Sequence, residues 1–148
     1  MFRGVANLNL DSKGRLAMPA KYRDALLSRS EGRLIVTADP SKCLLIYPFP
    51  DWEPIEQKLN GLSSFNPQTR ALQRLLVGMA SDTEMDGAGR ILLSAPLRQF
   101  AGLDKNVVLV GQGGKFELWD EGQWNVQLDQ ALLFQSGGLP PELEGFSL

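Results

Sequence analysis

The sequence contains no histidine among its 148 residues and only one cysteine, Cys43. Without histidine the chain lacks the commonest general base, the Ser–His and Cys–His nucleophile pairs, and the commonest metal ligand. A single cysteine excludes an intrachain disulfide and a cysteine-rich zinc site. These absences argue against an enzyme without excluding one, since enzymes without histidine exist. Our prediction is a protein that is not an enzyme and needs no metal, cofactor or small-molecule substrate, with Cys43 as a small apolar residue beside a strand.

Long apolar runs are also missing. No stretch approaches the roughly 18 apolar residues of a membrane span, and residues 1–5 lack the apolar segment of a signal peptide. Hydrophobic residues nevertheless make up 43% of the chain, which is enough for a packed core. We expect a cytoplasmic globular protein without a membrane partner.

Basic residues are absent from the C-terminal part of the chain. Residues 117–148 carry six acidic residues and no lysine or arginine, whereas residues 1–33 carry seven basic and three acidic residues. A local basic region in a chain of net charge −2 suits contact with a polyanion on one face. By charge count alone, an ordinary solvated surface is the simpler interpretation.

The most informative feature present is a repeat. Residues 11–23 (DSKGRLAMPAKYR) recur in degenerate form at residues 86–98 (DGAGRILLSAPLR), at a constant offset of 75 residues. The residues that match in register are Asp11/Asp86, Gly14/Gly89, Arg15/Arg90, Ala20/Ala95 and Arg23/Arg98. One such unit is too small to bury its apolar faces alone, but two units in one chain can bury these faces against each other. We therefore predict one interleaved, pseudo-twofold domain, with repeats at 1–64 and 65–135 and a mobile tail at 136–148.

Each unit is predicted to run hairpin, helix, hairpin, helix. In the first unit we expect strands at 4–10 and 15–18 paired as a hairpin, a helix at 20–28, strands at 34–38 and 44–47, and a helix at 51–62 with Asp51 as its N-cap. A further helix is expected at 67–77, capped by Asn66. In the second unit we expect strands at 79–85, 90–93, 107–110 and 116–119, a hairpin turn at 111–114, and helices at 96–101 and 121–134.

The Asp-x-x-x-Arg turn allows three interpretations. It can be purely structural, with the aspartate capping the turn and the arginine paired with a carboxylate. It can contact nucleic acid, because Lys13 and Arg15 project two cations from a small tip. Paired carboxylates sharing a proton would be catalytic, but the two turns lack matching neighbours. Lys13 becomes Ala88 in the second copy, so the first turn is the better candidate for a polyanion contact.

Four aromatic residues occur at matched positions of the two units: Tyr47, Trp52, Trp119 and Trp124. Each ends a strand or begins a helix, so we expect them to pack in the core or between subunits rather than to stack on bases.

Five segments of the sequence form a recognisable set: MFRG at 1–4, NLDSKGR at 9–15, CLLIYP at 43–48, MDGAGR at 85–90 and KFELWD at 115–120. Together they resemble the MraZ family of bacterial regulators, which is named for the cluster of division and cell-wall genes where it lies. The resemblance covers residues 1 to about 125, and its motifs are specific.

The resemblance implies an α+β, mostly β fold: two tandem swapped-hairpin modules of the AbrB type forming one pseudo-twofold β-barrel with helices around it. It also implies a ring-shaped homo-oligomer, associated with the nucleoid, that binds double-stranded DNA at direct repeats upstream of its own operon and acts as a transcriptional repressor or activator there. The DNA-binding residues would be Arg15, Lys13, Arg3, Gly14 and Arg90, with Asp11, Asp86 and Gly89 shaping the turns. The alternative is an antitoxin-like or scaffold module whose partner is another protein.

Overall fold

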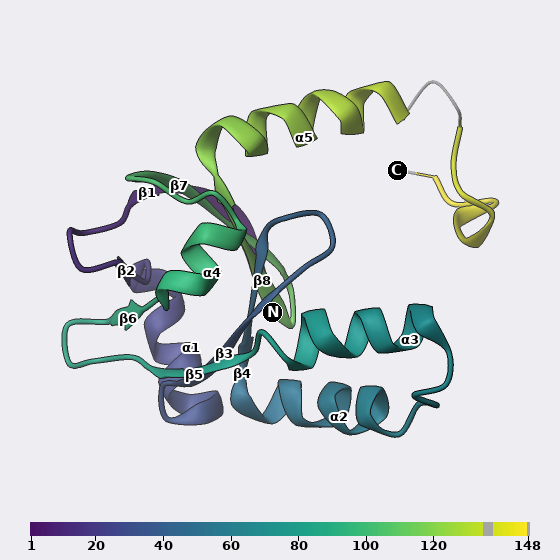
Figure 1. Cartoon of the computed structure of the whole chain (residues 1–148). Coiled ribbons are helices and arrows are strands. Elements are labelled where there is room, and N and C mark those ends of the chain that lie inside the picture. Colours follow the sequence, from purple (N-terminus) through teal and green to yellow (C-terminus); the bar gives the residue numbers. More distant parts are fainter. Residues whose placement is uncertain (135–137, 148) are drawn as a thin grey trace.

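The computed structural model describes residues 1–134 and 138–147, which form a mixed α+β fold (Figure 1). The first repeat contributes the strands β1 (Phe2–Asn9), β2 (Arg15–Ala17), β3 (Arg33–Ala38) and β4 (Leu44–Pro48). The second repeat contributes the strands β5 (Ser81–Glu84), β6 (Arg90–Leu92), β7 (Asn106–Gly113) and β8 (Lys115–Asp120). The predicted α+β class is confirmed, but the expectation of a mostly β protein is wrong, because helices hold more of the described residues than strands do.

The helices follow the predicted order. They are α1 (Ala20–Ser30), α2 (Phe49–Asn60), α3 (Pro67–Leu72), the π-helical turn η1 (Gln73–Val77), α4 (Ala95–Phe100), α5 (Glu121–Phe134) and the short 3₁₀ helix η3 (Pro141–Leu143). Among the described residues, no helix is both long and apolar enough to cross a membrane. The predicted tail at 136–148 falls partly outside the described residues, and its mobility stays a prediction.

The strands of the two repeats are interleaved. The six-stranded antiparallel sheet has the order β1-β7-β8-β4-β3-β5, and β2 pairs with β6 in a separate two-stranded ribbon. Exchanging each strand for its counterpart in the other repeat returns the same order read backwards. The predicted interleaving and pseudo-twofold symmetry are therefore confirmed at the level of strand pairing.

The predicted hairpins around the repeated turns are wrong in their pairing. β1 pairs along its whole length with β7 of the second repeat, from Phe2 opposite Gly113 to Asn9 opposite Asn106. In the same way β5 pairs with β3 of the first repeat. The turns do reverse the chain, but their two arms separate into different sheets because each arm buries its apolar residues against the other repeat.

The six-stranded sheet is open. Its terminal strands β1 and β5 do not pair with each other in the described part of the chain, so the closed β-barrel implied by the resemblance is not formed. β5 is only four residues long, and the chain leaves both terminal strands through the repeated turns into the separate β2–β6 ribbon. Because of these two features, β1 and β5 do not run side by side, and the sheet does not close.

The core lies between the sheet, the ribbon and helices α1 and α4. Phe2 and Phe116 stack with ring centroids 4.3 Å apart, and Tyr22 meets Phe116 edge-on at 4.9 Å. The largest fully buried side chains are Trp52, Phe116, Leu16, Met18, Leu26, Leu34, Leu44, Ile46, Ile91, Leu93, Leu97 and Leu109. They come from both repeats, so neither repeat has a core of its own.

The helix boundaries explain one correct and one wrong cap prediction. The Asn66 Oδ1 accepts hydrogen bonds from the backbone N–H groups of Gln68 and Thr69, which confirms the predicted cap of α3. Helix α2 begins two residues earlier than expected, directly after Pro48. Asp51 therefore lies in the first turn of α2, where it pairs with Arg29 of α1 at 2.6 Å instead of capping the helix.

Cys43 and the matched aromatic residues pack as expected. Cys43 is buried with Val108 and Trp119, and Trp124 packs against this cluster. Tyr47 contacts Trp52 at the equivalent place in the first repeat, with ring centroids 5.5 Å apart. Burial raises the pKa of the Cys43 thiol far above its usual range, which keeps the thiol protonated and unreactive.

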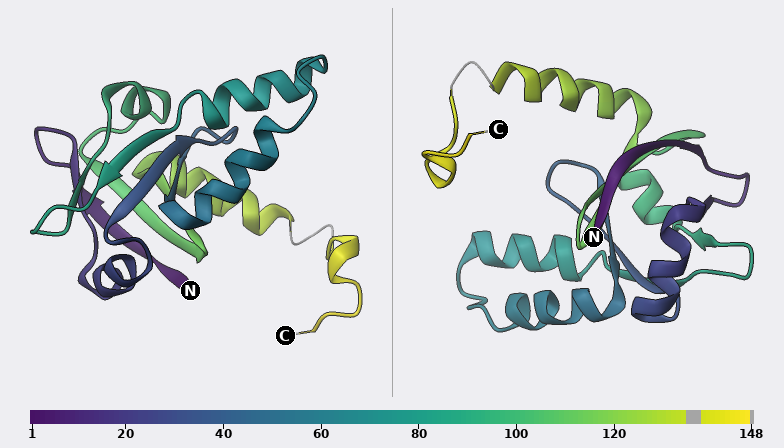
Figure 2. Two further views of the ribbon diagram at one scale, coloured as in Figure 1. Left: turned by 90° about the horizontal axis from the view of Figure 1, so that it is seen from below. Right: turned by 180° about the vertical axis from the view of Figure 1, so that it is seen from behind.

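Helix α5 extends away from the sheet and carries the chain toward its C-terminus, as two opposite views show (Figures 1 and 2). None of its residues is buried, although it is rich in apolar side chains. On the other side of the molecule, α2 packs beside α3 and η1, where Gln73 Nε2 donates to the carbonyl of Leu59 at 2.8 Å.

Candidate nucleic-acid interface

The two repeated turns project side by side from the same end of the molecule, the first between β1 and β2 and the second between β5 and β6 (Figures 1 and 2). Their backbones are closed in the same way. Gly14 N–H donates to the carbonyl of Asp11 at 3.0 Å, and Gly89 N–H donates to that of Asp86 at 2.9 Å. Both glycines have a φ near +80°, a region that disfavours every residue with a Cβ.

Each turn aspartate holds its turn together with both carboxylate oxygens. Asp11 Oδ1 accepts from the backbone N–H groups of Lys13 and Arg15, and Oδ2 accepts from Arg15 Nε at 2.7 Å. Asp86 repeats this pattern with Arg90 Nε at 3.0 Å. The structural part of the predicted Asp-x-x-x-Arg motif is therefore present in both copies.

The same bonds set the charge state of the aspartates. The backbone N–H of Arg15, together with its guanidinium, lowers the pKa of Asp11 to about 2. The backbone N–H of Arg90 likewise lowers the pKa of Asp86 below its ordinary value. Both carboxylates are ionised at neutral pH, and each fixes the Nε side of its arginine. The outer guanidinium nitrogens have no hydrogen-bond partner in the described part of the chain and can bind a ligand.

The β2–β6 ribbon places the two arginines on one face. Arg15 lies opposite Leu92 and Arg90 lies opposite Ala17, while the intervening pair, Leu16 and Ile91, is buried. Because side chains alternate along a strand, both arginines point to the outer face of the ribbon. A two-stranded ribbon with planar donors on its outer face has a shape that fits a groove of duplex DNA.

Residues of one repeat support the turn of the other. Leu93 N–H donates to the Gly14 carbonyl at 3.0 Å, and Met18 N–H donates to the Gly89 carbonyl at 2.8 Å. A Cβ built on Gly14 would lie 2.7 Å from the guanidinium of Arg98, and one built on Gly89 would meet Arg23 even more closely. Each turn is therefore packed against an arginine from the opposite repeat.

The predicted site residues fall into two groups. Lys13, Gly14, Arg15 and Arg90 come together at the projecting end, where Lys13 is exposed, Arg15 and Arg90 are half-buried and Gly14 is buried. Arg3 does not join them, because it lies near the start of β1, where its carbonyl accepts a hydrogen bond from the Tyr22 hydroxyl. Five residues of extended strand lie between Arg3 and Asn9, which places these two residues roughly 20 Å apart.

Arg23 and Arg98 were not among the predicted site residues, although the repeat aligns them with each other in the sequence. They match at the repeat offset of 75 residues, and only the exchange of strands brings each beside the turn of the other repeat. Within the described residues, no group of three or more acidic, cysteine or histidine side chains lies close enough to hold a metal ion.

The interleaved repeats and the paired turns define a tandem-repeat α+β protein with two projecting turns, each carrying an Asp–Arg pair. Residues 1–75 and residues 76–136 each match the family described as "MraZ protein, putative antitoxin-like", so the chain belongs to the MraZ family. Proteins named "Transcriptional regulator MraZ" from Nitrosomonas eutropha and Nitrosospira multiformis are 68% and 70% identical over 148 residues, covering both chains completely. One from Pseudomonas aeruginosa is 54% identical over 151 residues, again over the full length of both chains. Membership in this family confirms the predictions of the family and of a non-enzymatic protein.

Proposed function

We propose that the chain is a sequence-specific DNA-binding transcriptional regulator that acts in the cytoplasm, at the nucleoid. Its targets are short direct repeats upstream of its own division and cell-wall operon. The observation that carries this proposal is the pair of equivalent turns, each with an arginine on the outer face of one ribbon. Relatives of matching length carry the name of a transcriptional regulator.

Arg15 is the principal DNA contact in this proposal, with Lys13 and Gly14 beside it and Arg90 on the second turn. Asp11 fixes the Arg15 side chain in advance, which lowers the entropy lost on binding. An arginine fork can bind guanine or phosphate in two-point contacts. Arg3 lies at the other end of β1, so its contact would have to be made with a more distant part of the DNA.

A single subunit offers few cations, so its binding to DNA is weak and dependent on salt. Each neutralised phosphate contributes about −0.9 to the slope of log K against log salt. A ring-shaped homo-oligomer overcomes this weakness, because it presents the same tips several times and adjacent DNA repeats then add avidity. Direct repeats suit successive subunits of such a ring.

Helix α5 supports self-association. Its exposed apolar side chains include Val126, Leu128, Leu132 and Phe134, the last two being 65% and 78% exposed. The counterpart of α5 in the first repeat, α2, is covered by α3 and η1. In our proposal α5 of one subunit packs against α3 and η1 of the next subunit, a head-to-tail contact that can close into a ring.

Charge favours this pairing. No lysine or arginine occurs after residue 115, so the charged residues of α5, Glu121 and Asp129, are both acidic. Arg70 on α3 and Arg74 on η1 are exposed and enter no ion pair among the described residues. An apolar contact with opposite charges at its rim is typical of protein interfaces.

The same helix is the observation that favours the second candidate, an antitoxin-like or scaffold module. In that case α5 would bind a different protein, and the turns would serve only the fold. DNA binding and self-association distinguish the two candidates directly.

The test is a gel shift on the DNA upstream of the protein's own operon, with a footprint at two salt concentrations. We expect Arg15→Ala to abolish binding while the oligomer stays intact. The control is Arg29→Ala, which also removes an arginine from an ion pair with an aspartate, here Asp51. This pair joins α1 to α2 away from the turns, so the Arg29→Ala variant should bind DNA as the unmodified protein does. Unchanged affinity of Arg15→Ala, or no protected repeats at low salt, would contradict the DNA-binding proposal.

A further inference from the structure

We propose that the DNA backbone also lies across a hollow beside the first turn, where Arg98 and Lys105 of the second repeat contact its phosphates. The inference rests on the proposed DNA-binding function and deepens it. It makes the first DNA-contacting tip a composite of both repeats, and it assigns a phosphate-binding role to two residues outside the Asp-x-x-x-Arg motif.

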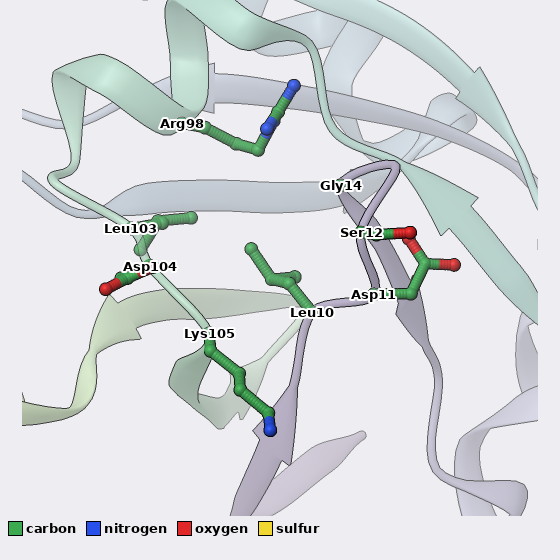
Figure 3. A pocket seen from close by; sticks show the side chains of 8 residues that line it. All are labelled: Leu10, Asp11, Ser12, Gly14, Arg98, Leu103, Asp104 and Lys105. Carbon is green, nitrogen blue, oxygen red and sulfur yellow. The ribbon is translucent and has the colours of Figure 1, made fainter.

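The hollow has a volume of about 540 Å³ and lies between the first turn and the segment that joins α4 to β7. Leu10 lies in its centre, with Arg98 and Gly14 at one end and Lys105 at the other (Figure 3). The Leu10 N–H donates to the Lys105 carbonyl at 2.8 Å, which holds this segment against the base of the turn. The hollow thus adjoins the edge from which Arg15 projects.

Its charge suits phosphate. The Asp11 carboxylate is already paired with Arg15, and the Asp104 carboxylate points away from Arg98 and from the turn (Figure 3). Arg98 Nε donates to the Leu93 carbonyl at 3.2 Å, and the other guanidinium nitrogens have no partner within the described residues. Lys105 is exposed and enters no ion pair there. The hollow is therefore lined by two cationic side chains, Arg98 and Lys105, and by one carboxylate, Asp104, that enters no ion pair among the described residues.

The second repeat provides an internal comparison. An equivalent hollow of about 330 Å³ lies beside the second turn, with Gly89 and Arg23 in the places of Gly14 and Arg98. It has no counterpart of Lys105, and Glu31 and Glu84 line it instead. The backbones of the two turns are alike, but the first hollow has an excess of positive charge and the second an excess of negative charge.

This difference sets the two tips apart. Phosphate contacts position a protein on DNA without reading the base sequence. The first tip combines Arg15 with a backbone-binding surface, whereas Glu31 and Glu84 repel the backbone from the second tip. The first turn therefore contributes more to DNA binding than the second turn does, because Arg98 and Lys105 of the second repeat lie beside it.

The test uses the full chain and fluorescence anisotropy on the operon-upstream DNA and on unrelated DNA, each over a series of salt concentrations. We expect Lys105→Gln to weaken binding to both DNAs by the same factor and to reduce the salt slope by about 1. Glu84→Lys should strengthen binding to both DNAs and steepen the slope by about the same amount. Lys58→Gln, an identical charge change on the exposed surface of α2, is the matched control and should leave the slope unchanged.

Lys105→Gln is preferred to a substitution of Arg98, because the Arg98 side chain also supports Gly14 and its loss could disturb the turn. If Lys105→Gln and Glu84→Lys both bind as Lys58→Gln does while Arg15→Ala abolishes binding, the hollow is not a phosphate site and the proposed function stands. If the unmodified protein binds neither DNA, the proposed function itself fails.

Discussion

Gly14 and Arg98 belong to different repeats, yet the guanidinium of Arg98 occupies the space that a side chain at Gly14 would need. A Cβ on Gly14 would lie 2.7 Å from Arg98 Nε. Gly89 and Arg23 repeat this relationship with the roles of the repeats exchanged. The interleaving of the sheet therefore continues to the projecting turns, and each turn depends on the fold of the opposite repeat.

The first prediction concerns Gly14. Gly14→Ala should destabilise the protein by about 1–3 kcal/mol, because alanine is strained at a φ of +80° and its Cβ would displace Arg98. Urea unfolding followed by circular dichroism measures the change. Gly87→Ala is the matched control in the second turn, where a Cβ meets nothing within 4 Å, and its effect should stay within about 0.5 kcal/mol. Equal effects of the two substitutions would contradict this account of the turn.

The second prediction concerns pH. The pKa of Asp11 is lowered from 3.8 to about 2 in the folded protein, so the bonds of its carboxylate stabilise the fold fully above about pH 4. This stabilisation is lost as the pH falls from about 4 to about 2, because the unfolded chain takes up a proton on Asp11 in that range, whereas the folded protein does so only near pH 2. Asp11→Asn cannot show this loss. The difference in unfolding free energy between the unmodified protein and Asp11→Asn should therefore shrink over that interval.

Chemical unfolding at a series of pH values from 5 to 2 measures this difference. Asp86→Asn should behave in the same sense, since the pKa of Asp86 is also lowered by its turn. A difference that stays constant over the whole interval would show that the Asp11 bonds contribute no pH-dependent stability.

Much of the secondary structure could be predicted from local patterns. Alternating apolar residues identify β1, Asn66-Pro67 identifies the start of α3, and the repeat offset identifies the whole second unit. Strand partners could not be predicted in the same way. A turn such as 11–14 usually joins two paired strands, and only the burial of apolar residues against the other repeat separates β1 from β2. That burial depends on residues far apart in the sequence, so a local sequence pattern cannot predict it.

Only the part of the candidate site that is local in the sequence could be predicted. Lys13, Gly14 and Arg15 are adjacent in the sequence, so a single turn brings them together. Arg98 and Lys105 reach that turn only through the exchange of strands between repeats. Arg3 is close to the turn in sequence but is carried away from it by the length of β1.

The third prediction compares the two turn arginines. Arg15 and Arg90 have the same aspartate partner geometry, with Nε–Oδ2 distances of 2.7 and 3.0 Å. Arg90→Ala should nevertheless weaken DNA binding less than Arg15→Ala, because the second turn lacks a counterpart of Lys13 and lies beside Glu84. Anisotropy titrations of both variants on the same DNA measure the two losses. Equal losses would show that both turns contact DNA to the same extent.

The last prediction concerns the contact between subunits. Leu132→Glu places a charge on the exposed apolar surface of α5, where the side chain is 65% exposed, and should lower the oligomer mass without unfolding the subunit. The subunit should stay folded because no α5 residue is buried within it. Gln130→Glu adds the same charge at an exposed polar position of the helix and should leave the mass unchanged. Sedimentation velocity measures the mass, and an oligomer equally large in both variants would mean that α5 does not join the subunits. If Leu132→Glu does dissociate the ring, its affinity for repeated DNA should fall to that of a single subunit, because the avidity of adjacent tips is lost.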